Sequence, residues 1–258
     1  MVKTDPDQMH FFEHLEELRG RILKSLILWL SVFIACFILV EPIFKILASP
    51  LIQITGSQHP FGAVAFQEPF LSKLKAAFWV SAILSSGIFF YHGWSFVAPA
   101  LEKAEKRFAI PFITFMAFFF LLGCLFSFYK VFPYALEYLI GWNEESNSAY
   151  TRSNYLSLLF SFVLGMGASF EMPLVIFFLA KVGLVTPGFL LRHFKYAVIL
   201  VFILAAIITP TPDIYMQTFL ALPMLLLYLL GVAAAYLVGR KEKQVAETLV
   251  EETEDETP

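Results

Sequence analysis

The sequence predicts an all-α integral membrane protein that crosses the bilayer six times. Of its 258 residues, 59% are apolar and only 15% are charged, and the mean hydropathy is +0.73. Soluble domains carry roughly a quarter charged residues. The apolar residues fall in long runs, which must be helical in lipid because each backbone polar group needs a partner within the segment. The net charge of −3 gives no indication of nucleic-acid binding.

Six apolar runs are the candidate spans. They cover residues 22–40, 70–97, 108–128, 155–181, 196–208 and 214–238. The first is too long for the apolar region of a signal peptide, so we expect it to be a span. The fifth has 13 residues, which is roughly 20 Å of helix against a hydrocarbon core of about 30 Å. It must therefore borrow flanking residues or lie where the bilayer is thinned. The sixth is longer, although Gln217 and Pro223 interrupt its first half.

Lys and Arg residues are distributed unequally between the two sides of these spans. Thirteen of them fall in the terminal segments and the connections on the same side, and five fall on the other side. The richer side should be cytoplasmic, which places both termini in the cytoplasm. Residues 1–239 then form a six-helix membrane domain, and the Glu-rich residues 240–258 form a cytoplasmic tail that we expect to be disordered.

Two acidic clusters lie on the predicted cytoplasmic side. On a helix before the first span, Glu13, Glu17 and Arg21 share a polar face because they are spaced by four residues. The second cytoplasmic connection contains Glu102 and Glu105. One interpretation is a pair of solvated surfaces, with a Glu17–Arg21 helix pair. The other is a joint carboxylate site for a guanidinium group, which bonds carboxylates in a bidentate manner.

Two further polar groups lie near or within spans. Glu171 lies deep in the fourth run, where an ionisable side chain is a functional candidate by default; it could also be a protonated carboxyl hydrogen-bonded inside the bundle. Ser161, Gly165 and Ser169 on the same helix are spaced for close helix packing. At the turn between the last two runs, Thr209 and Gln217 could offer a polar contact to another helix. Alternatively, Thr209, Asp213 and Gln217 simply cap this turn and the last helix.

Several stretches, in order along residues 9–239, resemble the motifs of TatC, the multispanning subunit of the twin-arginine protein translocase. The most specific are HLEELRGR, WSFVAPAL, EKR, SFEMP and TPTPD, at residues 14–21, 94–101, 105–107, 169–173 and 209–213. Residues 48–51 also match a proline segment of the first outer loop. Each motif alone is weak, but five in order on a six-span layout are highly specific.

The resemblance implies a glove-like, concave, non-enzymatic bundle with short fifth and sixth helices, in the bacterial cytoplasmic membrane and without a cofactor. It implies that twin-arginine signal peptides of folded precursor proteins bind at Glu17 and Glu105, with Leu18, Arg19 and Phe96 nearby. It places Glu171 on the concave face. It also implies that Thr209 and Gln217 contact the single-span subunits TatA and TatB in an oligomeric complex driven by the proton gradient. Four residues are expected to be structural: Pro50, Pro99, Pro173 and Asp213.

Three positions depart from the family pattern. Glu102 replaces an aromatic residue, Lys106 replaces an arginine, and Leu229 replaces a glutamate of the last helix. Glu102 adds a third carboxylate near the proposed signal-peptide site, and any role of the last-helix glutamate is not transferred to this chain.

Two other classes of function are weighed against the resemblance. A proton-coupled secondary transporter could use Glu171, but the sequence lacks internal repeats and paired broken spans. An intramembrane enzyme or metal site is disfavoured because the five histidines have no ligand spacing and no Ser/His/Asp arrangement is present. Cys36 and Cys124 lie in separate apolar runs, which does not indicate a disulfide or a redox site.

Overall fold

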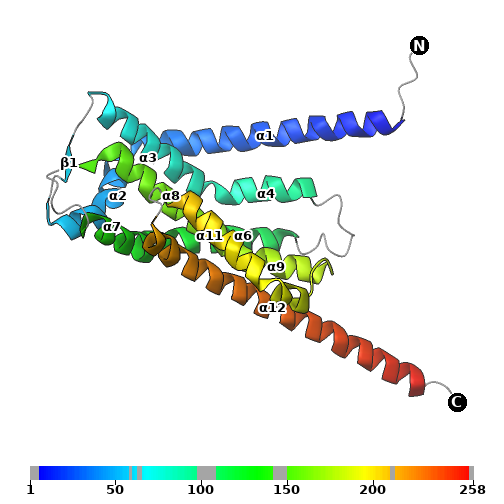
Figure 1. Cartoon of the computed structure of the whole chain (residues 1–258). Helices are drawn as coiled ribbons and strands as arrows, with labels where there is room; N and C mark the ends of the chain where they lie inside the picture. The colour runs from blue at the N-terminus through cyan, green and yellow to red at the C-terminus, as the bar shows by residue number, and fades with distance from the viewer. Residues whose placement is uncertain are drawn as a thin grey trace, which may run out of the picture. The chain divides into compact units, whose positions relative to one another are not determined.

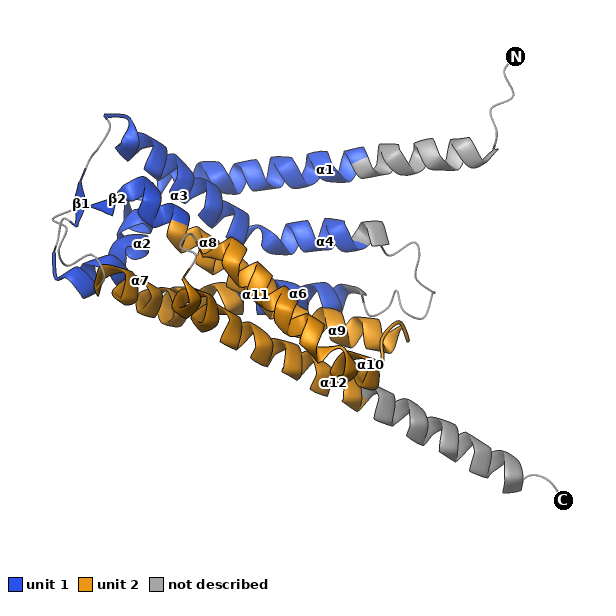
Figure 2. Cartoon of the chain, viewed as in Figure 1, with its two compact units in different colours: residues 1–121, 146–157 blue, residues 122–145, 158–258 orange. Residues whose placement is uncertain are grey.

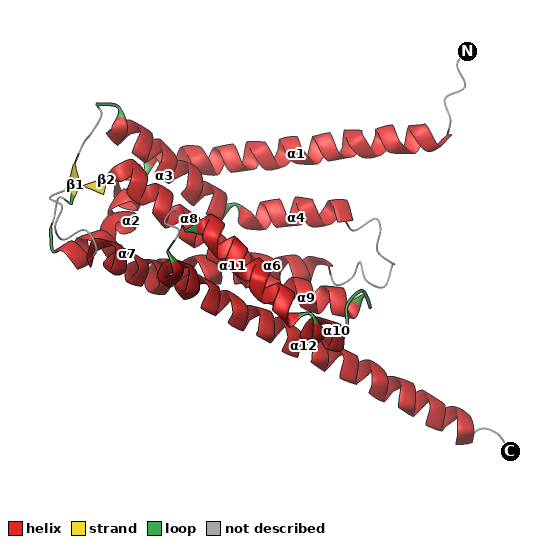
Figure 3. Ribbon diagram, in the orientation of Figure 1, coloured by secondary structure: helices red, strands yellow, loops and turns green. Residues whose placement is uncertain are grey.

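The structure, a computed structural model, describes residues 6–57, 60–62, 66–97, 109–141, 150–209 and 213–255, and the side chains of residues 19–57, 60–62, 66–94, 110–141, 150–209 and 213–237. These residues are almost entirely helical (Figure 3), which confirms the all-α class. The elements, most of which are labelled in Figure 1, are α1 (Pro6–Ile38), α2 (Val40–Thr55), β1 (Phe61–Gly62), α3 (Glu68–Leu84), α4 (Ser86–Val97), α6 (Ala109–Phe126), the π-helical η2 (Ser127–Val131), α7 (Phe132–Gly141), β2 (Tyr150–Thr151), α8 (Arg152–Phe170), α9 (Met172–Lys181), α10 (Pro187–Arg192), α11 (Phe194–Ile208) and α12 (Ile214–Asp255).

The chain divides into two compact units, coloured separately in Figure 2. Unit 1 consists of Met1–Leu121 and Ser146–Ser157, and unit 2 consists of Leu122–Glu145 and Leu158–Pro258. The predicted extent of one membrane domain, residues 1–239, stays a prediction.

The apolar helices agree with the predicted spans. Among the described residues, four stretches are long and apolar enough to cross a membrane, namely Arg19–Ile38, Ile110–Gly141, Arg152–Lys181 and Ile214–Leu237. A fifth consists of α3 and the first part of α4, with a bend of 50° between them. The bend falls at Ser85, whose backbone N–H still bonds to the carbonyl of Ser81. The remaining predicted run, the fifth in chain order, is α11, which has only 15 residues, so the expected short fifth span is present.

Three boundaries differ from the sequence prediction. The third run was expected to end at Phe128, but its helix continues through η2 into α7. The wide turn of η2 absorbs Pro133, which has no N–H to donate. The last helix is not short, because its apolar part, Ile214–Leu237, has 24 residues and continues past Pro223. The tail, expected to be disordered, continues α12 as far as Asp255; residues 240–255 contain no Gly or Pro and are rich in Glu, with Lys and Arg at their start, which favour helix.

In unit 1, aromatic and polar contacts join α2 to the start of α8. The two strands pair in parallel, with Phe61 opposite Tyr150. The guanidinium of Arg152 lies 5.9 Å from the ring centroids of both Phe44 and Phe61, a distance that suits a cation–π interaction. The hydroxyl of Tyr155 donates to the carbonyl oxygen of Leu47 at 2.6 Å. These contacts fix α2 against the end of the fourth span.

In unit 2, α12 packs closely on α9 because a glycine lies at the contact. A Cβ atom added at Gly231 would lie 2.7 Å from Ile176 Cδ1 and 3.1 Å from Pro173 Cα. Around this contact, a buried apolar cluster contains Ile176, Ala180, Leu190, Tyr228, Val232 and Ala235. The Tyr228 hydroxyl donates to the carbonyl of Leu190 at 3.0 Å. Small residues therefore let the last span pack closely, as is usual between membrane helices.

Candidate functional site

The proposed carboxylate site lies largely outside the described side chains. Glu105 and Pro99 are outside the described residues, and Glu17, Leu18 and Phe96 lie in described helices whose side chains are not described at these positions. Arg19 is described and is exposed on α1. The structure does pack α1 against α4 within unit 1. The helices that carry Glu17 and Phe96 are therefore neighbours, while the geometry of the carboxylates stays a prediction.

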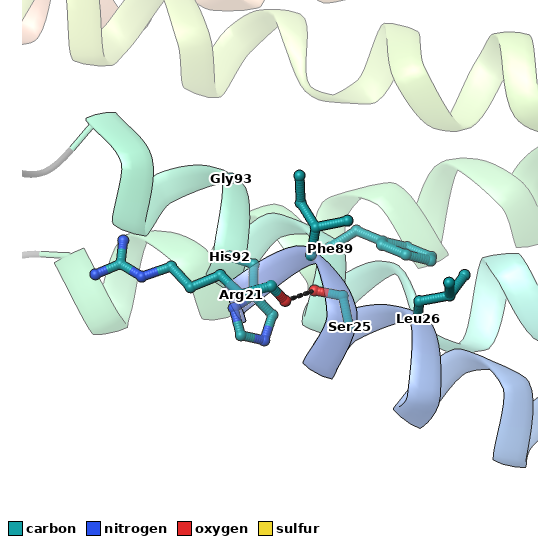
Figure 4. Close-up of a pocket in the computed structure, with 7 residues that line it drawn as sticks. Arg21, Ser25, Leu26, Phe89, His92 and Gly93 are labelled. Carbon is teal, nitrogen blue, oxygen red and sulfur yellow. Dashed lines mark hydrogen bonds between the residues drawn. The ribbon is translucent and has the colours of Figure 1, made fainter. Parts of the chain in front are cut away.

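A cavity of about 370 Å³ lies between α1 and α4. It is lined by side chains at helical spacing on each helix, namely Arg21, Ile22, Ser25 and Leu26 of α1 and Phe89, His92 and Gly93 of α4. Figure 4 shows Arg21 and His92 toward one end of this group and Leu26 and Phe89 toward the other. The Ser25 hydroxyl donates to the carbonyl of Arg21 at 2.9 Å, so it is occupied within α1. The sequence analysis missed this cavity, because it is formed by two helices about 70 residues apart in sequence.

Glu171 lies at the junction of α8 and α9. Its side chain is only 8% exposed, and its backbone has helical dihedrals (φ −74°, ψ −20°). Pro173 occupies the first turn of α9 and donates no backbone hydrogen bond, so the two helices are separated there. The carboxylate is thus held inside unit 2, and the expected position on a hydrated concave face stays a prediction.

Glycines allow close packing on both sides of this junction. A Cβ atom at Gly165 would lie 2.5 Å from Cδ1 of Ile208, so α8 approaches the end of α11 where the small-residue spacing predicts close packing. A Cβ atom at Gly123 would lie 2.8 Å from Cγ of Phe170. The Ser169 hydroxyl bonds the carbonyl of Gly165 at 2.7 Å. The carboxylate therefore lies in a densely packed part of unit 2.

Thr209 and Asp213 cap the last two helices of unit 2. Thr209 is 5% exposed, and its hydroxyl donates to the carbonyl of Ala205 at 2.9 Å. Asp213 accepts a hydrogen bond from the backbone N–H of Met216 at 2.8 Å. Such a bond satisfies one of the free N–H groups at the start of α12. The capping interpretation of these two residues therefore agrees with the structure.

Gln217 instead joins two helices and borders a groove. Its Nε2 donates to the carbonyl oxygen of Phe202 at 2.7 Å, which ties α12 to α11. The groove, of about 510 Å³, lies along α11 and is lined by Val198, Ile199, Phe202, Ile203, Ala206, Ile207 and Gln217. Ile199, Ile203 and Ile207 are 57%, 51% and 74% exposed. Their spacing of four residues was visible in the sequence, but almost every neighbour is also apolar, so no single face stood out.

The other residues considered are a structural proline, an ion pair outside the spans and two cysteines. Pro50 is buried inside α2. Glu41 of α2 forms an ion pair with Lys73 of α3, and this hydrogen-bonded lysine holds the pKa of the carboxyl below its ordinary value. Cys36 and Cys124 are buried, free thiols. Within the described part of the chain, no group of three His, Cys, Asp or Glu residues could hold a metal ion.

Comparisons with known proteins agree on one family. The model of the family described as Sec-independent protein translocase protein (TatC) matches residues 13–223. A TatC protein of Koribacter versatilis is 37% identical over 92% of this chain and 88% of its own length, and one of Helicobacter pylori is 38% identical over 89% of this chain and 88% of its own. A crystal structure described as the twin-arginine translocase receptor TatC superimposes with a TM-score of 0.76 at 33% identity, covering 88% of this chain and 99% of that one.

Proposed function

This chain belongs to the TatC family of Sec-independent protein translocase proteins, and we propose that it is the receptor subunit of a twin-arginine translocase. The family consists of non-enzymatic protein translocase components, which agrees with the expected class. The observation that carries the proposal is the match over residues 13–223, because this range includes both Glu17 and Glu105.

The proposed ligand is the arginine pair of a signal peptide, bound from the cytoplasm. Two carboxylates, Glu17 and Glu105, suit two guanidinium groups because each guanidinium donates two parallel hydrogen bonds to a carboxylate. Leu18, Arg19 and Phe96 border the same region. The packing of α1 against α4 supports the proposal, since it makes neighbours of the helices that carry Glu17 and Phe96.

A binding measurement tests this assignment. In nanodiscs, Glu17→Gln and Glu105→Gln should each weaken binding of a twin-arginine peptide by about ten- to a hundredfold, since a charge-assisted hydrogen bond contributes roughly 1.5–3 kcal/mol. For a peptide with two lysines in place of the arginines, the wild type and the variants should bind with the same affinity. Glu171→Gln is the matched control, because it also removes one carboxylate but should bind the peptide normally. Unchanged affinity in both Glu17→Gln and Glu105→Gln would contradict the proposal.

The proposed role of Glu171 is to shape the protein rather than to bind the arginine pair. Its burial at the junction of α8 and α9, where neighbouring helices pack closely, supports this, because such a site leaves little room for a peptide. In an export assay, Glu171→Gln should retain much of the activity, while Glu171→Leu should lose more. Equal loss in both variants with peptide binding intact would instead indicate a proton-linked role.

We also propose that single-span subunits of the TatA and TatB kind bind along α11. The exposed apolar groove next to Gln217 supports this position, because a helix packed there would cover apolar side chains and meet one polar group. Thr209 was the other expected contact, but its buried hydroxyl already bonds within α11. The complex would lie in the bacterial cytoplasmic membrane with both termini of this chain in the cytoplasm, and the proton gradient would drive export.

A further inference from the structure

We propose that the turn between α9 and α11 lies in the headgroup region of the cytoplasmic leaflet and binds anionic phospholipids there. Its binding surface is an aromatic patch, defined as Phe189, His193 and Tyr196, with the cationic side chains of Arg192 and Lys195 beside it. All five residues belong to unit 2 and lie within residues 150–209, which the structure describes without a gap.

Hydrogen bonds give this turn a fixed backbone. Gly183 ends α9 in the left-handed region, with a φ of 78°, and the N–H of Leu184 then bonds to the carbonyl oxygen of Leu179 at 2.9 Å. The side-chain oxygen of Thr186 accepts the N–H of Phe189 at 3.2 Å and so caps α10. The turn therefore presents a defined surface, from which α11 continues after a single residue.

One side of α10 is attached to the core of unit 2. Leu190 is buried in the apolar cluster that contains Ile176 of α9, and its carbonyl oxygen accepts a hydrogen bond from the Tyr228 hydroxyl at 3.0 Å. Figure 1 shows α10 beside α12, which it contacts. The flanking side chains of Phe189 and Leu191 are 53% and 55% exposed. The protein thus holds α10 in place and leaves large apolar side chains on it uncovered.

The aromatic patch runs from α10 into α11. The ring centroids of Phe189 and His193 lie 4.2 Å apart, and those of His193 and Tyr196 lie 6.0 Å apart in a stacked arrangement. The Nδ1 atom of His193 donates to the carbonyl oxygen of Phe189 at 2.8 Å, which fixes the orientation of the ring. Tyr196 is 58% exposed. Rings with one polar end are enriched at the boundary between membrane and water, so the patch has the composition of a surface in the headgroup region.

Exposed cations beside the patch match the charge of anionic headgroups. Arg192 ends α10 and is exposed, and its guanidinium group presents parallel N–H donors that suit phosphate oxygens. Lys195 is also exposed, with its Nζ atom 5.1 Å from the centroid of the Tyr196 ring. The sequence contains no acidic residue between Glu171 and Asp213. The local charge of the turn is therefore positive.

The position of the turn favours lipid as the occupant of the patch. The span Arg152–Lys181 ends where the turn begins, and the apolar α11 begins at Phe194. The Lys and Arg distribution puts this end on the cytoplasmic side, where anionic lipids attract basic groups close to the membrane. Binding there would fix the depth at which the short α11 enters the bilayer. This placement rests on the predicted membrane orientation of the chain and not on signal-peptide binding.

Site-specific fluorescence quenching in vesicles tests the proposal. A bimane label on Gly188→Cys, in the full chain with Cys36 and Cys124 replaced by alanine, reports the surroundings of α10, because a Cβ atom at Gly188 meets nothing within 4 Å. Phosphatidylglycerol with a doxyl group near its headgroup should quench the label about threefold more than doxyl-labelled phosphatidylcholine at the same mole fraction. Phe189→Ser should lower the quenching by both lipids, because it removes an apolar side chain from the patch.

The double variant Arg192→Gln/Lys195→Gln should lose the preference for phosphatidylglycerol and keep the quenching by phosphatidylcholine. Lys130→Gln is the matched control, because Lys130 is likewise an exposed lysine beside an exposed tyrosine, Tyr129, and lies on the predicted outer side of unit 2. It should leave both signals unchanged. Arg192→Lys keeps the charge and should keep most of the preference, which provides a folded variant if the double variant unfolds.

Equal quenching by the two lipids in the labelled chain without further substitution would overturn the proposal, as would a loss of preference in Lys130→Gln equal to that in the double variant. No quenching by either lipid would place the turn in water. Loss of the quenching when a single-span subunit is added would assign the patch to a protein partner instead. Binding of a twin-arginine peptide should be unchanged in Arg192→Gln/Lys195→Gln, and weaker peptide binding there would connect the patch with the proposed peptide site and overturn the assignment to lipid.

Discussion

The first and last spans are almost equally apolar but differ in how much of them the protein covers. An 18-residue stretch within Arg19–Ile38 of α1 has a mean hydropathy of 2.0, and 11% of it is buried, whereas an 18-residue stretch within Ile214–Leu237 of α12 has a mean hydropathy of 2.2, and 44% of it is buried. Hydropathy reports that a segment prefers lipid or protein to water, and it does not distinguish between these two neighbours. The amount of covering depends instead on small residues at the contact.

The two helices carry those small residues differently. In α12, Gly231 approaches Ile176 and Pro173, while Ala221 and Ala235 are fully buried. In α1, Gly20 has open space around it, and large exposed side chains such as Ile27 and Ile38 surround the axis. The last span is therefore a structural partner of α9, whereas the first presents its side chains to lipid or to other molecules.

Replacing Gly231 of α12 and Gly20 of α1 by leucine should give the largest difference in stability between the two spans. Gly231→Leu must displace Ile176 and the Pro173 backbone, and overpacking of this kind destabilises by roughly 1–3 kcal/mol or more. Gly20→Leu meets nothing within 4 Å and should be neutral or stabilising by up to about 1 kcal/mol, because leucine favours helix more than glycine. Thermal unfolding in detergent, followed by circular dichroism, measures both. An unchanged unfolding temperature for Gly231→Leu would show that the close contact does not limit stability.

A smaller effect should distinguish the exposed groove of α11 from the buried cap beside it. Gln217→Leu should lower copurification of a single-span partner by a few-fold, because hydrogen bonds between membrane helices contribute about 0.6 kcal/mol on average. Thr209→Val is the control: it removes a hydroxyl that is buried and already bonded to Ala205, so partner binding should change less. Retention of all partner by Gln217→Leu, or an equal loss in Thr209→Val, would argue against the groove as the contact.

The smallest expected effect lies outside the spans, at the pair of Glu41 and Lys73. Lys73 lowers the pKa of Glu41 in the folded protein, so the pair stabilises the fold above the ordinary pKa of a glutamate and this contribution is lost as pH falls through the lowered value. Glu41→Gln should therefore unfold slightly earlier than wild type at pH 7 and at nearly the same temperature at pH 3. The effect is small because both side chains are exposed, at 38% and 66%.

Glu137→Gln is the control for this pair, since it removes another exposed carboxylate, in α7. It should leave the unfolding temperature nearly unchanged at pH 7. A larger change in Glu137→Gln than in Glu41→Gln would show that the effect comes from net charge rather than from the pair.

Much about this protein was determined by the sequence alone. Long apolar runs must be helical in lipid, so the fold class and the approximate spans followed from composition and run length. The short α11 followed from a run of only 13 apolar residues before Thr209. The motifs around Glu17, Glu105 and Glu171 identified the family, because their order along the chain is specific even though each one is weak. The sequence also suggested capping by Thr209 and Asp213, since such bonds join residues close in sequence.

Only the tertiary structure decided which apolar surfaces are covered and which polar groups meet. The bond from Gln217 to Phe202 depends on how α11 and α12 pack, and the cavity at Arg21 and His92 depends on how α1 packs on α4. The continuation of the third helix through η2 depends on a local widening of the backbone around Pro133. In a membrane protein nearly every helix position is apolar, so the periodic contrast that marks a buried face in a soluble helix is largely lost. The contacts between helices then depend on side-chain shape, which becomes visible only when the helices are placed together.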